Sequence, residues 1–242
     1  MRNIKLTIEY DGTNYAGWQF QTNAISIQEI IENAIKKIIH LDIRLNSAGR
    51  TDAGVHAKGQ TANFKANIQI PLWNLKQGIN SCLPPDIYIA NCEDAPLDFH
   101  SRFDAKKKHY RYIVCRSHSP FNLNYSYFYP FKFSIEHIKE ASQYFLGKHN
   151  FKSFTPITSN DVQYIRSIDK INITEENEFV HLDFEAPSFL HNMIRIMVGT
   201  LLENARRNFH PAEIKNILLS KNRINAGRTA PARGLFLMKV YY

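Results

Sequence analysis

The sequence has few cysteines, and the three it has form no functional pattern. Cys82, Cys92 and Cys115 are an odd number, lie far apart and have no Cys-x-x-Cys spacing, so neither a disulfide framework nor a structural zinc site is expected. Long apolar runs are lacking too, because no stretch could span a bilayer and the N-terminus has no signal-peptide core. These absences predict a cytoplasmic protein without membrane contact.

Phosphate-binding glycine loops are also missing. No GxGxxG motif occurs, and no GxxxxGK followed by Ser or Thr, which argues against dinucleotide or nucleoside-triphosphate chemistry. Asp52 and His56 are four residues apart, but no second carboxylate or His-x-x-x-His pattern accompanies them. We therefore expect no metal and no cofactor.

Acidic residues are outnumbered by basic ones. Lys and Arg total 30 against 22 Asp and Glu, for a formal net charge of +8. Such an excess favours a polyanionic partner, since Lys and Arg gain affinity by releasing counterions from phosphates, although many basic proteins are merely soluble. The chain has 242 residues, of which 44% are hydrophobic, enough for one large domain or two small ones.

Apolar periodicity predicts an α+β chain made of two halves with the same order of elements. In the first half we expect strands near 4–10, 43–46, 61–66 and 87–91, with helices over 26–39 and after Pro71. In the second we expect strands near 109–115, 165–173, 179–185 and 235–241, with helices over 134–146, 188–206 and after Pro211. Antiparallel strands with helices on one face fit this order. We place the halves at 1–104 and 105–242, sharing one sheet or a tight interface because no linker separates them.

The segment GRTDAGVHAKGQ, 49–60, is the most informative one. It places a carboxylate, Asp52, two residues after a guanidinium, Arg50, between Gly49 and Gly54. The glycines allow a tight turn and close approach of a substrate to the main chain. Arg50 favours the anionic form of Asp52, which is the state of a nucleophile or an electrostatic stabiliser. A turn aspartate paired with a surface arginine would give the same pattern, so the loop alone leaves both interpretations open.

Two further segments combine aromatic residues with polar ones. YDGTNYAGWQFQ, 10–21, is either a packed hairpin loop or a surface on which bases stack. DAKKKHYRYIVC, 104–115, interleaves cations with Tyr110 and Tyr112, which suits phosphate neutralisation with base stacking or simply a solvated strand edge.

Arginine also occurs where the surroundings are apolar or rich in glycine. Arg195 lies in the apolar helix SFLHNMIRIMVGTLL, and a buried arginine needs an acidic partner, either a structural carboxylate or a catalytic one. NAGRTAPARGLFL, 225–237, carries two glycines around two arginines and leads into the final strand. This last segment is also compatible with a simple turn.

Together these motifs resemble one family, the tRNA pseudouridine synthases of the A type. YDGTNYAGWQFQ, AGRTDAGVHAKGQ, FDAKKKHYRYIV, FLHNMIRIMVGTL and TAPARGLFL match that family in identity, order and spacing over nearly the whole chain. The resemblance implies two tandem ferredoxin-like (RRM-like) halves forming one extended, mainly antiparallel sheet with helices on one face. It also implies a homodimer that binds tRNA and isomerises uridines of the anticodon stem-loop, tRNA positions 38–40, by base flipping.

Roles follow from the resemblance residue by residue. Asp52 corresponds to the essential aspartate, Arg50 to the arginine that helps displace or hold the flipped uridine, and Tyr110 to the tyrosine stacked on that base. Arg195 corresponds to the arginine that pairs with the aspartate, and Leu235 to the apolar residue on the other side of the base.

This chain departs from the family pattern at three positions. His191 stands where tyrosine is common, Asn63 where histidine is common, and Arg233 where an acidic residue or histidine is frequent.

Two rival functions remain compatible with the residues. A non-catalytic tRNA-binding module or RNA chaperone would need the same charge and tyrosines, and only the Asp52 loop separates it from an enzyme. A metal-dependent RNA-cleaving enzyme would lose activity with a chelator and would shorten its substrate.

Overall fold

The chain consists of two compact units, each containing helices and strands. The computed structural model describes residues 1–159 and 161–242. By its contacts, the first unit comprises Met1–Lys106 with Phe236–Tyr242, and the second comprises Lys107–Leu235. The α+β class expected from the sequence is confirmed. The final strand belongs by its contacts to the first unit, whereas the sequence analysis assigns all of 105–242 to the second half.

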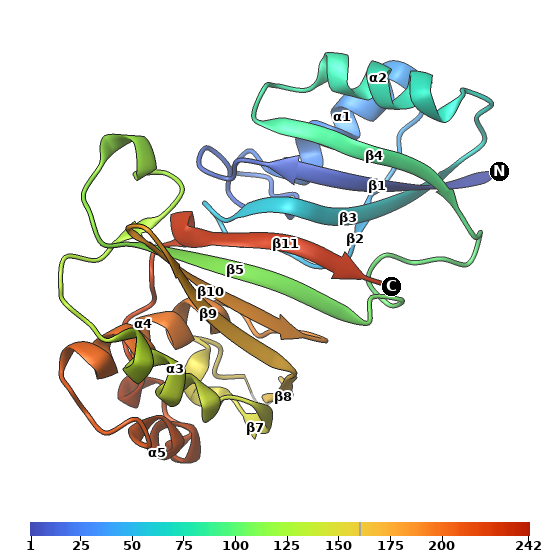
Figure 1. The fold of residues 1–242 in the computed structure, drawn as a ribbon. Coiled ribbons are helices and arrows are strands. Elements are labelled where there is room, and N and C mark those ends of the chain that lie inside the picture. Colours follow the sequence, from blue (N-terminus) through green and yellow to red (C-terminus); the bar gives the residue numbers. More distant parts are fainter. Residues whose placement is uncertain (160) are drawn as a thin grey trace. The chain divides into compact units, whose positions relative to one another are not determined.

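The first unit is built on a sheet (Figure 1). Its strands are β1 (Arg2–Tyr10), β2 (Asn46–Ser47), β3 (His56–Ala66), β4 (Ile87–Ala95) and β11 (Leu235–Tyr241). β1 lies between β4 and β3 and is antiparallel to both, and β2 pairs with β3. β11 runs parallel to β3 on its other side, so that Phe236 pairs with His56. The strand expected near 61–66 is thus longer at its start and reaches back to the Asp52 loop.

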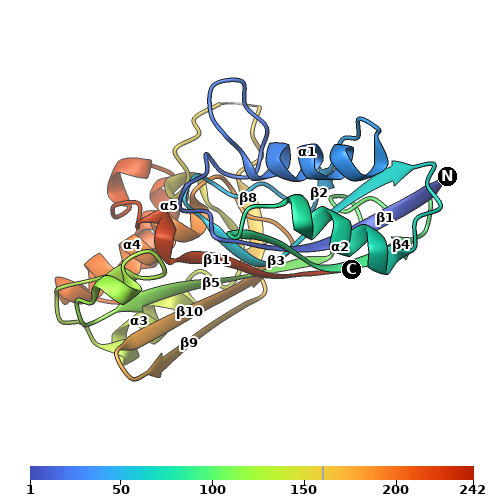
Figure 2. The same cartoon turned by 90° about the horizontal axis from the view of Figure 1, so that it is seen from above.

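Two helices complete this unit. They are α1 (Ile27–Ile39) and α2 (Leu72–Cys82). α1 begins where the sequence predicts, because the Ser26 hydroxyl accepts a hydrogen bond from the Glu29 N–H and caps the helix. Figure 2 shows α1 and α2 next to each other, and α2 contacts β4. Alternate residues of β1, Ile4, Leu6 and Ile8, are fully buried, as expected for a strand with one core face.

The second unit has four strands in its main sheet and a separate strand pair. Its strands are β5 (Lys107–Cys115), β6 (Tyr127–Phe128), β7 (Gly147–Asn150), β8 (Ile165–Ile168), β9 (Lys170–Glu176) and β10 (Phe179–Ala186). β10 lies between β5 and β9 and is antiparallel to both, while β6 pairs with β5. β7 and β8 form their own two-stranded sheet. The single strand expected over 165–173 is therefore two strands, which belong to different sheets.

Helices of the second unit partly differ from the expectation. They are α3 (Ile135–Gln143), α4 (Met193–Arg206) and α5 (Glu213–Ser220), with short 3-10 turns η1 (Pro120–Asn122), η2 (Lys152–Phe154), η3 (Arg223–Asn225) and η4 (Ala232–Gly234). The expected start of α4 at Ser188 is wrong. Asn192 has a φ of 57°, a left-handed conformation that a helix interior does not admit, so the helix starts at Met193. None of the helices within residues 1–159 and 161–242 is long and apolar enough to cross a bilayer.

A carboxylate on β10 ties this strand to β5. Asp183 accepts hydrogen bonds from His109 Nε2 at 2.6 Å and from Arg111 Nε at 2.9 Å. Burial alone would raise the pKa of Asp183, but the hydrogen bonds from His109 and Arg111 lower it by more, so the net shift is downward. The ionised form of Asp183 therefore stabilises the second unit.

Replacing this carboxylate tests its contribution. We expect Asp183→Asn to lower the unfolding free energy by about 2 kcal/mol at neutral pH, because hydrogen bonds to charged groups contribute roughly 1.5–3 kcal/mol. The pKa of Asp183 is lower in the folded state than in the unfolded one, so this stabilisation is complete above the unfolded pKa and is lost as the pH falls through the folded pKa. Urea unfolding of both proteins between about pH 7 and about pH 3 should therefore show curves that converge in acid.

An exposed ion pair provides the control. Asp42 pairs with Lys36, but its side chain is 84% exposed, so Asp42→Asn should leave stability nearly unchanged. Equal losses for the two variants at neutral pH would contradict the role assigned to Asp183.

Candidate active site

The Asp52 loop connects β2 to β3 in the first unit and is closed by its own backbone. The N–H of Val55 donates to the carbonyl of Asp52 at 3.1 Å, and Gly54 takes a φ of 75°, which glycine adopts without strain. The Gln60 side chain holds the entry of the loop by donating to the carbonyl of Gly49 at 2.8 Å. Asp52 itself is half-buried. The loop is thus a fixed turn that leaves its carboxylate partly accessible.

The loop that follows β1 packs directly on the backbone of the Asp52 loop. The Trp18 N–H donates to the carbonyl of Thr51 at 3.1 Å, and the Gly54 N–H donates to the carbonyl of Tyr15 at 3.4 Å. The hydroxyls of Tyr10 and Thr51 share a buried hydrogen bond of 2.8 Å. The residues on both sides of Asp52 are therefore held by the same neighbouring loop.

Two glycines make this close packing possible. A Cβ on Gly12 would lie 2.0 Å from the Val55 carbonyl oxygen, and a Cβ on Gly17 would lie 2.5 Å from the Thr51 carbonyl oxygen. Trp18 is only 1% exposed and belongs to the core. Of the two interpretations of segment 10–21, the packed loop fits Trp18, whose ring is not available for base stacking.

His56 is the residue of this region that the sequence analysis undervalued. The histidine is buried, its Nδ1 lies 3.1 Å from the Gly12 nitrogen and 3.0 Å from Asp11 Oδ1, and its ring stacks on Phe236 with 4.6 Å between centroids. The first residue of β3 thus contacts both the loop after β1 and the start of β11. The sequence analysis considered His56 only as a metal ligand beside Asp52, and no local pattern in the sequence indicated its packing on Phe236.

In the second unit, two tyrosines of β5 share the buried face. Tyr110 is buried, with its ring edge-on to Phe189 at 5.3 Å between centroids. Tyr112 donates its phenol hydrogen to the carbonyl of Pro231 at 2.7 Å, and burial raises its pKa well above the usual value. A Cβ on Gly234 would lie 2.7 Å from the Tyr112 ring, so the η4 turn packs directly on this ring and ends at the buried Leu235.

Arg195 lies in the first turn of α4 and is oriented by neighbours in its own unit. Its Nε donates to the carbonyl of Ala230 at 2.8 Å, and its Nη1 donates to Asn192 Oδ1 at 2.6 Å. The chain segment before Ala230 crosses α4 at Gly199, where an added Cβ would meet the Arg228 carbonyl oxygen at 1.8 Å. Segment 227–235 is therefore fixed to both Arg195 and β5.

The predicted site residues fall into two groups. Asp52 and the exposed Arg50 lie in one loop of the first unit. Tyr110, Arg195 and Leu235 lie in the second unit, where segment 227–235 connects the surroundings of Arg195 with those of Tyr112. Arg195 is held by side-chain hydrogen bonds, and Tyr110 and Leu235 are buried, whereas Arg50 is exposed.

The basic run at the start of β5 is less available to a ligand than its sequence suggests. Lys107 pairs with Glu185 at 3.1 Å, and His109 and Arg111 both contact Asp183. Three basic side chains of the run therefore contact carboxylates of β10, which limits their contribution to phosphate binding.

The position of Asn63 explains one departure from the family pattern. Its side chain is buried, donates to Asn3 Oδ1 at 2.8 Å and accepts from the Ser101 N–H at 2.9 Å. The Asn3 amide in turn donates to the carbonyls of Pro96 and Phe99. Asn63 therefore fixes the segment after β4 to the sheet. Within residues 1–159 and 161–242, no cluster of three or more His, Cys, Asp or Glu is placed to hold a metal ion.

Known proteins similar to this chain identify its family. The family model described as tRNA pseudouridine synthase matches residues 6–104 and 141–242. The tRNA pseudouridine synthase A of Thermoanaerobacter sp. (strain X514) is 41% identical over 244 aligned residues, which cover 100% of both chains. The protein of that name from Clostridium acetobutylicum is 44% identical, again over 100% of both chains. This chain therefore belongs to the tRNA pseudouridine synthase family, which is a family of isomerases.

Similarity to solved structures is weaker. The crystal structure of a Cbf5-Nop10-Gar1 complex contains a chain that is 13% identical, with a TM-score of 0.37, over 96% of this chain and 57% of that one. This chain thus spans little more than half of that protein. At this level the similarity carries no argument about substrate or partners.

Substitution of Gly17 tests whether the loop after β1 sets the position of Asp52. Gly17 has a φ of +90°, and an added Cβ would push against the Thr51 carbonyl oxygen at 2.5 Å. We expect Gly17→Ala to lower kcat for uridine isomerisation at least severalfold. The free energy of unfolding should fall by more than the roughly 1–2 kcal/mol that a left-handed conformation costs a non-glycine residue. Tritium release from tRNA and urea unfolding measure the two effects.

Gly147 is the matched control for this substitution. Its φ is +86°, yet the nearest atom to an added Cβ lies 3.9 Å away, so Gly147→Ala carries the backbone cost without the steric one. We expect Gly147→Ala to be less stable than wild type with an unchanged kcat. Equal kcat values for the two variants would show that packing at Gly17 does not position the catalytic loop.

Proposed function

We propose that this chain converts uridines in the anticodon stem-loop of tRNA, at tRNA positions 38–40, to pseudouridine, with Asp52 as the catalytic carboxylate. The observation that carries this proposal is the backbone packing around Asp52. The carbonyl of Thr51 and the N–H of Gly54 are both bound by the loop after β1, so the carboxylate between them is held in place before a substrate arrives.

The reaction itself explains why a fixed, ionised carboxylate is needed. Isomerisation breaks the bond between uracil and ribose, rotates the base and joins it again through carbon five, with loss of the proton from that carbon. Breaking the first bond leaves the ribose electron-deficient. The Asp52 anion either traps this centre covalently or stabilises it, or removes a neighbouring sugar proton, and all these routes use the ionised form. No electrons are exchanged and no outside group is added, so the reaction needs no cofactor.

The other site residues serve substrate handling in this proposal. Arg50 is exposed, so its guanidinium contacts a base that has left its stack. Removing the base from the stack costs a few kcal/mol. Tyr110 and Leu235 are buried. The Tyr110 ring and the Leu235 side chain sandwich the flipped base and exclude water, which would otherwise hydrolyse the detached sugar. By the family resemblance, Arg195 serves as the arginine partner of the catalytic aspartate. The support for this last role is that Ala230 and Asn192 orient the guanidinium.

The proposed assembly follows the family resemblance. Two ferredoxin-like halves, 1–104 and 105–242, form one extended sheet, and two copies of the chain bind one tRNA. A cytoplasmic location fits the three cysteines, all of which have free thiols.

Replacing Asp52 separates this proposal from a tRNA-binding module or RNA chaperone. We expect wild type to release tritium from full-length tRNA labelled at uridine carbon five, with a chelator present. Asp52→Asn should bind tRNA with similar affinity and release no tritium, because it keeps the shape of the side chain and removes the charge. Filter binding and counting of released tritium measure the two properties.

Asp98 offers a matched control, because it is exposed and lies outside the loop. Asp98→Asn should keep both binding and turnover. Full turnover in Asp52→Asn would refute the catalytic assignment, and tRNA binding by wild type without tritium release would favour the binding module.

The phenol of Tyr110 is tested by removing one oxygen. If this hydroxyl assists loss of the proton from carbon five, Tyr110→Phe should lower kcat about a hundredfold, the lower end of general acid–base contributions. The affinity for tRNA should change little, because the stacked ring is kept. Single-turnover tritium release gives the rate of this step. An unchanged rate would restrict Tyr110 to stacking.

A further inference from the structure

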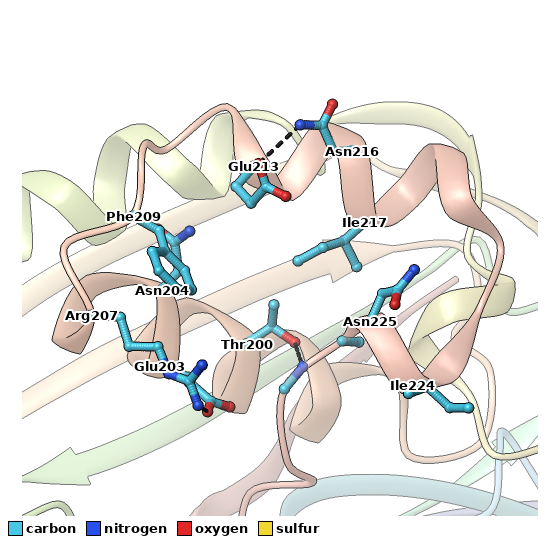
Figure 3. A pocket seen from close by; sticks show the side chains of 12 residues that line it. Thr200, Glu203, Asn204, Arg207, Phe209, Glu213, Asn216, Ile217, Ile224 and Asn225 are labelled. Carbon is cyan, nitrogen blue, oxygen red and sulfur yellow. Dashed lines mark hydrogen bonds and ion pairs between the residues drawn. The ribbon is translucent and has the colours of Figure 1, made fainter.

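A pocket of about 400 Å³ lies in the second unit, away from the proposed site residues (Figure 3). It opens between α4, α5 and η3. Its lining consists of Thr200, Glu203, Asn204, Arg207, Phe209, Glu213, Asn216, Ile217, Ile224, Asn225, Ala226 and Gly227. The volume falls within the range of pockets that hold small ligands, and none of the residues proposed for catalysis lines it.

The lining combines a flat aromatic side chain with amides. Phe209 is 47% exposed, and the Arg207 guanidinium lies 5.7 Å from the centre of its ring. In the view of Figure 3, Ile217 lies between Phe209 on one side and Asn225 on the other. A half-exposed ring beside a cation and amides suits a nucleobase, because every base has a face that stacks and an edge that pairs with amides.

One of the three amides is available for such pairing. Asn204 contacts His137 Nε2 at 2.7 Å, and Asn216 donates to Glu213 Oε2 at 2.9 Å. Asn225, by contrast, makes no side-chain hydrogen bond to the residues that the structure describes. Its amide offers both a donor and an acceptor at the edge of the pocket.

Basic residues are frequent in the segment that contains the pocket. The lining itself holds one cation, Arg207, which pairs with Glu203 at 2.6 Å, and a second carboxylate, Glu213. Over residues 200–228, the basic side chains are Arg206, Arg207, Lys215, Lys221, Arg223 and Arg228, and the acidic ones are Glu203 and Glu213. Phosphate contacts from Arg and Lys supply most of the affinity for nucleic acids, whatever their sequence. An acidic peptide would use the charge but not the stacking surface.

The pocket wall continues into the candidate active site. The Gly227 N–H donates to Thr200 Oγ1 at 2.9 Å and closes the pocket. Three residues later, the carbonyl of Ala230 accepts from Arg195, and the carbonyl of Pro231 accepts from Tyr112. A group bound in the pocket therefore rests on the same fixed segment that leads to Leu235.

We propose that this pocket, the α4–α5 pocket, binds one unstacked nucleotide of the tRNA substrate, distinct from the uridine that is isomerised. The base stacks on Phe209 and pairs with the amide of Asn225. The inference rests on the proposed function, because it takes tRNA as the substrate.

Two lining residues test the α4–α5 pocket, and the readout is KM separately from kcat. We expect Phe209→Ala to raise the KM for full-length tRNA about fivefold or more, as loss of one base–aromatic stack does, with kcat unchanged. Asn225→Ala should raise KM in the same direction. Because the Asn225 side chain is exposed and makes no hydrogen bond to the described residues, its removal does not endanger the fold.

Phe121→Ala is the matched control, since Phe121 is 88% exposed in the same unit and does not line the pocket. Its KM should equal that of wild type. A KM within twofold of wild type for both pocket variants would overturn the inference. A changed oligomeric state in either variant, measured by light scattering, would assign the pocket to a protein interface and also overturn it. Wild type is tested for tritium release in the same assay. If wild type releases tritium, an unchanged KM in the pocket variants contradicts only the inference about the α4–α5 pocket and not the proposed function.

Discussion

The fit between two backbones is the constraint on which the Asp52 loop depends. Gly12 and Gly17 let the loop after β1 approach the carbonyl oxygens of Val55 and Thr51 so closely that no side chain fits between them. Hydrogen bonds from Trp18 and to Tyr15 then fix the main chain on both sides of Asp52. Main-chain groups have little conformational freedom once paired, so the carboxylate position is set by rigid parts rather than by other flexible side chains.

The second unit uses the same device. Gly199 lets the carbonyl of Arg228 cross α4 at close range, and Gly234 lets the η4 turn lie on the Tyr112 ring. The segment between these contacts then presents the carbonyl of Ala230 to Arg195. In both units, a glycine lets two segments approach closely. A carbonyl oxygen at or near this contact belongs to a neighbour of a proposed site residue, as Thr51 is of Asp52, or accepts a hydrogen bond from one, as Ala230 does from Arg195.

Local patterns predicted most elements but not the contacts between distant segments. The alternation of Ile4, Leu6 and Ile8 and the cap at Ser26 gave β1 and α1 correctly, because both depend on neighbouring residues alone. The start of α4 was missed because the left-handed conformation of Asn192 is set by packing. For the same reason, nothing local indicated that β11 pairs with β3, that His56 packs on Phe236, or that Asp183 contacts His109 and Arg111.

The contrast between Arg50 and Arg195 follows from these constraints. Arg195 is oriented by the carbonyl of Ala230 and by Asn192, so its charge has a fixed direction, as required of a group that acts on another fixed group. Arg50 is exposed at the edge of the Asp52 loop, where it is suited to follow a base that moves. In the proposed function these two arginines therefore take different parts, Arg195 beside a group that stays in place and Arg50 beside the base that leaves its stack. The α4–α5 pocket would add a second anchor for the RNA on the segment that already orients Arg195, which keeps the sugar-phosphate chain fixed while the base rotates.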